Sequence, residues 1–354
     1  MDTLQLTKSQ SRSTLERIGY GSCGSVWADS SFPDIDQRAS ALVLKRGDGL
    51  PDRSLSNEGE IHRHILSTLQ TTGWDSDSLG FKVNIPLYID FLQPESASWA
   101  NILPRLPSHF TACQALISER IMPMPRPARE LIVECFWTGS EDMNEVIFSD
   151  KRNEHCLLRP YLGRRKTLLG KGEEGPRRSM LKPTISLRNY PLHINQIEAL
   201  GLPAAEYASA MADALAFLLW EAQIDVCDVE FVLARPRSNT GDSQPHLGSR
   251  SFTPGVLGPH SLWILDFDCC RKLSMDGEGV QLAVERFWRN DPFYPTPDTR
   301  CGEDVKLWDV FSDRFLETSR RIMEGKDEAM RQLPRQFISR ITKTIGVYTK
   351  GVPL

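Results

Sequence analysis

The sequence lacks paired cysteines at short spacing. It has eight cysteines but no C-x-x-C pair, and a zinc ribbon or finger holds its metal with such pairs. The adjacent Cys269 and Cys270 cannot easily bind the same metal ion, because neighbouring side chains on a strand point to opposite faces. We therefore expect no zinc finger, and reduced, mostly buried thiols.

The chain also lacks a long apolar run and a large excess of charge. The longest apolar stretch, around Ala214 to Trp220, is far shorter than the roughly 20 residues of a spanning helix. The N-terminal residues 1–17 are polar and have no signal-peptide core. A net charge of −4 gives no reason to expect nucleic-acid or membrane-surface binding. We expect an intracellular protein, cytoplasmic or nuclear, that binds a small-molecule substrate or a protein partner.

What is present is the composition of an ordinary globular protein. Of the 354 residues, 40% are hydrophobic and 25% charged, and this length suits two lobes. We place an N-terminal lobe at residues 1–122 and a C-terminal lobe at residues 123–354. Residues 166–183 and 235–260 are rich in Gly, Pro, Ser or charge and are expected to be long loops.

The pattern of apolar residues changes along the chain. The first hundred or so residues are strand-rich, with one helix expected at residues 57–70, where apolar side chains recur at helical spacing. Residues 202–223 contain the clearest helix, rich in alanine. The stretches EFVLA and SLWILDFDCC that follow are expected to form a pair of strands.

Three glycines near the N-terminus follow the spacing G-x-G-x-x-G. They are Gly19, Gly21 and Gly24 in RIGYGSCGSVWA, with Val26 two residues later. The pattern alone fits a plain hairpin as well as a phosphate-binding loop. Lys45 ends the apolar strand ALVLK, 19 residues after Val26, and from there it could reach the phosphates of a nucleotide beneath the loop.

An acidic residue on the following helix could hold this lysine in place. Glu58 and Glu60 both lie near the start of the helix, about 200° apart around its axis, so only one of them can face Lys45. We favour Glu58, because Ile61 three residues later would pack inward beside it.

Acidic residues also follow the alanine-rich helix. Asp225 and Glu230 are separated by the spacing of a catalytic aspartate and a metal ligand, and Asp228 is an alternative to Asp225 in a shorter loop. Asp266 follows the next apolar strand, and its carboxylate would suit Mg²⁺. The candidate catalytic residues are thus Lys45 and either Asp225 or Asp228. The candidate metal ligands are Asp266 and Glu230.

The order of these parts resembles the protein-kinase-like fold, from about Ile18 to Trp308. The resemblance implies an α+β, bilobal architecture, with an antiparallel sheet and one helix in the N-terminal lobe and a mainly helical C-terminal lobe. It implies ATP and Mg²⁺ as cofactors. The segment ALISERIMPMP looks like the hinge, where the backbone at Glu119 and Ile121 would hold an adenine edge. The dipeptide at Asp266 resembles the start of the D-F-G motif.

The sequence departs from protein kinases at three places. Gln223 and Ile224 stand where His and Arg precede the catalytic aspartate, Glu230 replaces the metal-binding Asn, and Asp268 replaces the Gly of D-F-G. A glutamate adds negative charge beside the phosphates, and an aspartate takes up positive φ less easily than glycine. The segment RNDPFYPTP, in place of A-P-E, is proline-rich and suits a fixed structure. Small-molecule acceptors are therefore favoured over proteins.

A closer likeness covers most of the chain. Several strings resemble a fungal family known only as a domain of unknown function, whose members are sometimes named zinc-finger proteins: LRPYLGRR, SLRNYPLHINQIEALGL, YASAMADALAFLLWEAQIDVCDVEFVLA, LWILDFDCC and RNDPFYPTP. This resemblance implies a filamentous-fungal source. The cysteine spacing does not support the zinc label.

Three functions remain open from the sequence. The first is an ATP-dependent phosphotransferase that acts on a small-molecule hydroxyl. The second is a pseudokinase that serves as a binding or regulatory scaffold, as the altered motifs suggest. The third is a regulatory protein unrelated to nucleotides, which the zinc-finger name would fit.

Overall fold

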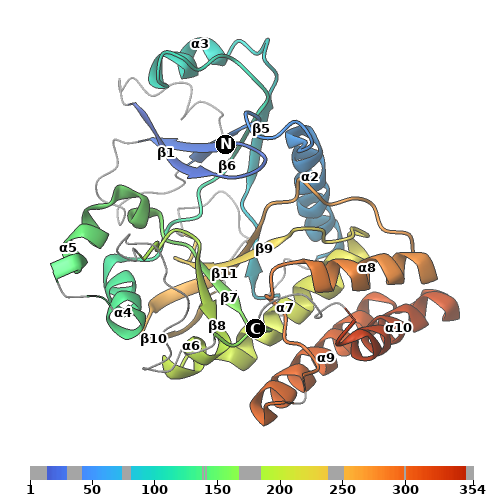
Figure 1. The fold of residues 1–354 in the computed structure, drawn as a ribbon. Helices are drawn as coiled ribbons and strands as arrows, with labels where there is room; N and C mark the ends of the chain where they lie inside the picture. The colour runs from blue at the N-terminus through green and yellow to red at the C-terminus, as the bar shows by residue number, and fades with distance from the viewer. Residues whose placement is uncertain are drawn as a thin grey trace.

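The structure is a computed structural model that describes most of the chain (Figure 1). The described residues are 14–29, 42–73, 81–137, 139, 142–166, 185–237, 251–298 and 300–347. Most of the two expected loops, at 167–184 and 238–250, lies outside these ranges. Within them, no helix has both the length and the hydropathy that crossing a membrane requires.

The N-terminal part is built on a five-stranded sheet in the order β1-β2-β3-β6-β5. Every neighbouring pair is antiparallel, as the sequence predicts. The strands are β1 (Leu15–Tyr20), β2 (Ser25–Asp29), β3 (Leu42–Arg46), β5 (Tyr88–Leu92) and β6 (Ala115–Glu119). Leu15, Trp27 and Leu44 of the first three strands belong to one buried cluster, as expected of a sheet with one face on a core.

Helix α2 (Leu55–Thr72) packs beside this sheet, close to the expected 57–70. Ser54 caps its start by accepting a hydrogen bond from the backbone N–H of Asn57. Gly73 ends it in the left-handed conformation, at φ 69°. A short helix, α3 (Trp99–Ile102), and a 3-10 turn, η3 (Leu103–Arg105), follow β5. This part therefore holds more than the single helix expected.

A second sheet lies in the C-terminal part, which the sequence predicted to be mainly helical. Its order is β10-β11-β9-β7-β8, and β4 pairs with β11 in parallel. The strands are β4 (Val83–Asn84), β7 (Leu158–Tyr161), β8 (Tyr190–His193), β9 (Glu230–Ala234), β10 (Phe252–Gly255) and β11 (Gly258–Leu265). β9 and β11 are the pair of strands that the sequence predicts. The other four are only two to four residues long, so their period-2 pattern is too brief to detect.

Helices surround this second sheet, and one of them is almost wholly buried (Figure 1). Helix α7 (Ala204–Ala216) continues into a π-helical segment, η5 (Phe217–Glu221), so the expected helix at 202–223 is present with an altered last turn. Helix α9 (Gly302–Ile322) packs along α7. The others are α4 (Arg126–Phe136), α5 (Asp142–Ser149), η4 (Lys151–His155), α6 (Ile194–Ala199), α8 (Gly277–Arg289) and α10 (Glu328–Thr344).

The largest buried cluster extends across the expected boundary at residue 122. Ile61, Ile65 and Leu69 of α2 and Val83 of β4 belong to the same core as α7, α9 and the second sheet. The N-terminal sheet has a smaller core of its own around Trp27. The fold is thus α+β, with an antiparallel sheet first and most helices later.

Candidate functional site

A cavity of about 530 Å³ is lined by residues of both sheets. Ile18, Val26 and Val43 line it from the N-terminal sheet, and Leu157 and Leu265 from beside β7 and the end of β11. Charged residues complete the wall. A cavity of this size and mixed lining is typical of a small-molecule site.

The glycine-rich stretch is a tight hairpin that covers part of this cavity. Backbone hydrogen bonds join the N–H of Gly21 to the C=O of Gly24 at 2.9 Å, and the N–H of Gly24 to the C=O of Gly21 at 3.2 Å. Gly24 has φ 147°, and a Cβ there would lie 1.8 Å from the carbonyl oxygen of Arg46. At Gly21 a Cβ would have no atom within 4 Å. Gly24 is therefore required by the backbone, whereas Gly21 leaves open space.

Lys45 lies under this hairpin and contacts two carboxylates. Its Nζ is 2.7 Å from Glu58 Oε2 and 2.8 Å from Asp266 Oδ1. Glu58 is the helix residue that the sequence favoured, and its rival Glu60 is exposed. Burial alone would lower the pKa of Lys45, but the charges of Glu58 and Asp266 outweigh it and raise the pKa. Burial raises the pKa of Glu58 to about 7, against the opposing charge of Lys45.

Two further groups sit beside Lys45 and were not predicted. The thiol of Cys23, at the hairpin tip, lies 3.8 Å from Glu58 Oε2, and burial raises its pKa to about 12. His62 Nε2 lies 2.6 Å from the carbonyl oxygen of Pro86, and burial lowers its pKa to about 4. At neutral pH both groups are uncharged, so Lys45 is the cation at this point of the cavity.

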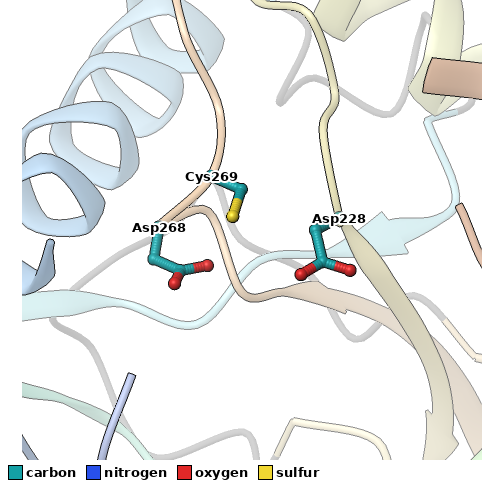
Figure 2. A group of neighbouring side chains, drawn as sticks. All are labelled: Asp228, Asp268 and Cys269. Atoms are coloured by element: carbon teal, nitrogen blue, oxygen red, sulfur yellow. The ribbon is translucent and has the colours of Figure 1, made fainter. Parts of the chain in front are cut away.

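Arg53, just before α2, contacts three groups that together have the spacing of a metal site. Asp228, Asp268 and Cys269 bring their ligand atoms within 4.8 Å of one another (Figure 2). The Arg53 Nη1 atom is 3.0 Å from Asp228 Oδ2 and 3.1 Å from Asp268 Oδ2, and it also contacts Cys269 Sγ. The guanidinium already supplies the positive charge that a metal ion would bring to this group.

Glu230, at the start of β9, is held by a second arginine. Arg159 of β7 pairs with Glu230 and, at 3.2 Å, with Asp291. Burial raises the pKa of Glu230 to about 7, although the charge of Arg159 opposes this. Asp266 lies close enough to add to the increase. Glu230 and Asp266, the predicted metal ligands, therefore both line the cavity, each with a cationic partner.

Asp225 and Asp228, which the sequence could not separate, occupy different environments. Asp225 is 1% exposed and its Oδ1 accepts the backbone N–H of Arg271 at 2.9 Å. Its Oδ2 is 3.4 Å from Arg286 Nε, and it does not line the cavity. Asp228 lines the cavity, and its side chain is 52% exposed. Only Asp228 is in a position to contact a bound ligand.

The segment after β6 has free backbone groups facing the cavity wall. Glu119 is held by Arg237, at 2.8 Å, and its side chain accepts the backbone N–H of Leu87. Among the described residues, no hydrogen bond joins the backbone N–H or C=O of Ile121. Both Glu119 and Ile121 line the cavity. Ile121 therefore offers one donor and one acceptor to a ligand.

All but one of the site residues predicted from the sequence lie at this cavity. The cavity is lined by all of them apart from Asp225: Gly19, Gly21, Gly24, Val26, Lys45, Glu58, Glu119, Ile121, Asp228, Glu230 and Asp266. The arginines at 53, 120, 159 and 188 also line it and were missed. No local motif marks them, because their partners lie far along the chain.

Comparison with known proteins gives a partial family match. Residues 262–327 match the model of the family DUF3669, a domain of unknown function described as a zinc finger protein. The match covers less than a fifth of the chain. No curated protein matches the sequence.

The residues in the matched segment do not fit a zinc finger. The segment contains three cysteines, Cys269, Cys270 and Cys301, and no histidine. Among the described residues, the single group with metal-binding spacing includes only Cys269 from these three, and Arg53 fills it. A structural zinc site needs four converging nitrogen or sulfur ligands, and the described residues of the matched segment do not provide them.

Proposed function

We propose that the chain has a protein-kinase-like fold, binds ATP with Mg²⁺ in the cavity, and transfers a phosphoryl group to a small-molecule hydroxyl. The observation that carries this proposal is the contact of Lys45 with both Glu58 and Asp266 beneath the glycine hairpin. A lysine fixed by one carboxylate and adjacent to a second, cavity-lining carboxylate is the arrangement that positions phosphates and their metal in kinases.

The apolar side chains suit the base of the nucleotide. Val26 and Val43 from the N-terminal sheet and Leu265 from the end of β11 would contact a flat ring. The open backbone N–H and C=O of Ile121 would then pair with the adenine edge. Burying an aromatic base between aliphatic side chains contributes roughly 25 cal/mol per Å² of apolar surface.

The donor set near Lys45 suits a hard cation. Asp266 and Glu230 present carboxylate oxygens, which Mg²⁺ prefers. When bound, the ion neutralises charge on the phosphates. Glu230 has a pKa of about 7, so it would give up its proton to act as a ligand. Cation binding through Glu230 should therefore strengthen as the pH rises through 7.

Asp228 is the cavity residue suited to orient the acceptor. The acceptor oxygen forms a bond to the γ-phosphorus while the bond from that phosphorus to the β–γ bridging oxygen breaks. ADP leaves with that electron pair, and the hydroxyl proton passes to the Asp228 carboxylate. Lys45 neutralises charge on the phosphates throughout. Asp225, buried under the loop, has a positioning role instead.

One observation favours the second candidate, a pseudokinase that binds without turnover. Arg53 and Arg159 already pair with Asp228, Asp268 and Glu230. These ion pairs would have to open before the carboxylates could bind a metal or accept a proton. If they stay closed, the cavity would bind a ligand and do no chemistry.

Thermal shift with ATP, with and without Mg²⁺, tests the proposed binding. We expect a concentration-dependent rise in Tm in the wild type, which a Lys45→Ala, Asp266→Ala double variant loses. Lys82→Ala, which removes an exposed lysine paired with Glu206, serves as the matched control and should keep the shift. The absence of any shift at millimolar ATP would overturn the proposal.

Turnover separates the two candidates. ADP release in the presence of hydroxylated metabolites should fall by at least a hundredfold in Asp228→Asn, because the acceptor loses its proton acceptor. Binding of ATP without ADP release by the wild type, for every acceptor class, would favour the pseudokinase.

A further inference from the structure

The charged side chains in the cavity wall form ion pairs, with two exceptions. Each carboxylate has a cationic partner no farther than 3.2 Å away. The pairs are Glu58 and Asp266 with Lys45, Asp228 and Asp268 with Arg53, Glu230 and Asp291 with Arg159, and Glu119 with Arg237. Arg120 and Arg188 also line the cavity, and neither forms an ion pair with any described residue.

Arg120, directly after β6, is partly buried and forms no ion pair with the described part of the chain. Its Nε atom is buried and has no hydrogen-bond partner among the described residues. Its nearest polar contact is His155 Nδ1, at 3.5 Å from Nη2. Burial, and then the charges of Arg120 and other arginines, lower the pKa of His155 to about 4. This histidine is therefore neutral, and only the longer-range charge of Glu16 opposes the effect of burial, which lowers the pKa of Arg120.

Arg188, in the segment before β8, lines the same cavity beside the hairpin. It donates a hydrogen bond to the carbonyl oxygen of Tyr20, which fixes the guanidinium against the glycine hairpin. Burial, followed by the charges of Arg17 and Arg159, lowers its pKa. The arginine charges around this guanidinium outweigh that of the one carboxylate acting on it, Glu230, which makes it an attractive site for an anion.

These two arginines are separate from the groups proposed to hold the nucleotide phosphates. Lys45 contacts Glu58 and Asp266, whereas Arg120 lies beside His155 and Arg188 beside Tyr20. Phosphates placed at Lys45 would therefore leave the two arginine charges to be met by another part of the bound ligands.

We propose that the acceptor is anionic: a small hydroxylated molecule whose phosphate or carboxylate group is received by Arg120 and Arg188, a role that rests on the proposed phosphotransfer in the same cavity. The planar guanidinium forms two parallel hydrogen bonds with either group. Binding such a group would also satisfy the buried Nε of Arg120. Neutral sugars and alcohols would leave the charge unmatched and bind poorly.

Anion binding is tested with inorganic phosphate and with malonate, each measured by thermal shift at constant ionic strength. We expect both to raise the Tm of the wild type. The Arg120→Gln, Arg188→Gln variant should bind them at least tenfold more weakly, because two charged hydrogen-bonding groups are lost. Arg331→Gln, on α10 and away from the cavity, is the matched control. A stronger response to phosphate than to malonate would assign a phosphorylated acceptor, and the reverse a carboxylated one.

The thermal shift with ATP, measured on the same variants, shows whether the acceptor proposal or the phosphotransfer proposal has failed. The Lys45→Ala, Asp266→Ala variant should lose the ATP shift and keep the anion shift, and the double arginine variant should do the opposite. If the double arginine variant keeps the anion shift, or loses the ATP shift, the acceptor proposal is overturned. If no protein responds to ATP but only the arginine variant loses the anion shift, the anion site stands and phosphotransfer fails.

Discussion

The cavity wall contains two sets of charges that differ in how they are balanced. In the paired set, Lys45, Arg53 and Arg159 each contact two carboxylates. In the arginine pair, Arg120 and Arg188, no described carboxylate lies within ion-pair distance. The paired set is satisfied before any ligand arrives, so it fixes the shape of the site. The arginine pair is satisfied only by what binds.

Replacing one arginine from each set is the most direct way to break this comparison. Arg159→Met leaves Glu230 and Asp291 without their shared cation, and we expect a loss of about 3 kcal/mol in the free energy of unfolding at pH 8. Arg188→Met strands no carboxylate and should cost less than about 1 kcal/mol. Urea unfolding measures both. Equal losses would show that the two sets do not differ.

The two aspartates of the loop before β9 sharpen the comparison for acidic groups. Asp225→Asn weakens a buried acceptor of the Arg271 backbone N–H, so we expect about 2 kcal/mol of destabilisation. Asp228→Asn changes a half-exposed ion pair with Arg53 and should cost less than about 1 kcal/mol. Thermal and urea unfolding check both values. A larger loss for Asp228→Asn would reverse the roles given to the two residues.

The pH dependence of stability tests the state of Glu230. Its pKa rises from 4.5 to about 7 on folding, mainly through burial. The folded protein therefore holds a proton that the unfolded chain releases, and this contribution to stability is full below pH 4.5 and is lost as the pH rises through 7. Glu230→Gln does not titrate, so the variant should gain about 2 kcal/mol relative to wild type between pH 5 and pH 8.

Glu58 also titrates near pH 7, but it is present in both proteins and cancels in this difference. A stability difference that stays constant from pH 5 to pH 8 would contradict the burial of Glu230 as a neutral acid.

Removing Arg53 gives the clearest expected change in ligand preference. Arg53→Gln leaves Asp268, which is 2% exposed, without its cation, so we expect a loss of about 2 kcal/mol. Asp228, Asp268 and Cys269 would then converge without a positive charge between them. We expect an additional Mn²⁺ site in the variant, detectable by calorimetry in the absence of nucleotide. Equal Mn²⁺ binding by both proteins would show that Arg53 does not occupy this group.

Much of the site could be predicted because its parts follow a fixed order along local elements. Lys45 ends a strand, Glu58 starts the next helix and Asp266 follows another strand, and each position is set by its own segment. The choice between Glu58 and Glu60 needed only the period of a helix. The choice between Asp225 and Asp228 needed the path of the loop, where Val226 and Asp228 have φ of 50° and 62°. Such turns leave no periodic signal.

The arginines could not be predicted for a different reason. Arg53 meets Asp268 across a separation of 215 residues, and Arg159 meets Asp291 across 132. A lone arginine in a turn or strand is compatible with solvent exposure, and only the tertiary fold shows its partner. Of the second sheet, only the antiparallel pair β9 and β11 was predicted. The other strands were missed for a related reason, because a strand as short as β4 has no recognisable pattern in the sequence.

The pairing of β4 with β11 also dictates an order of events during synthesis. Val83 is aligned with Leu262, so the strand that completes this edge emerges from the ribosome about 180 residues later than its partner. Until then the apolar side of α2 lacks much of its core. The nascent chain therefore exposes apolar surface until β11 is synthesised. We expect it to depend on chaperones most before residue 262 is made.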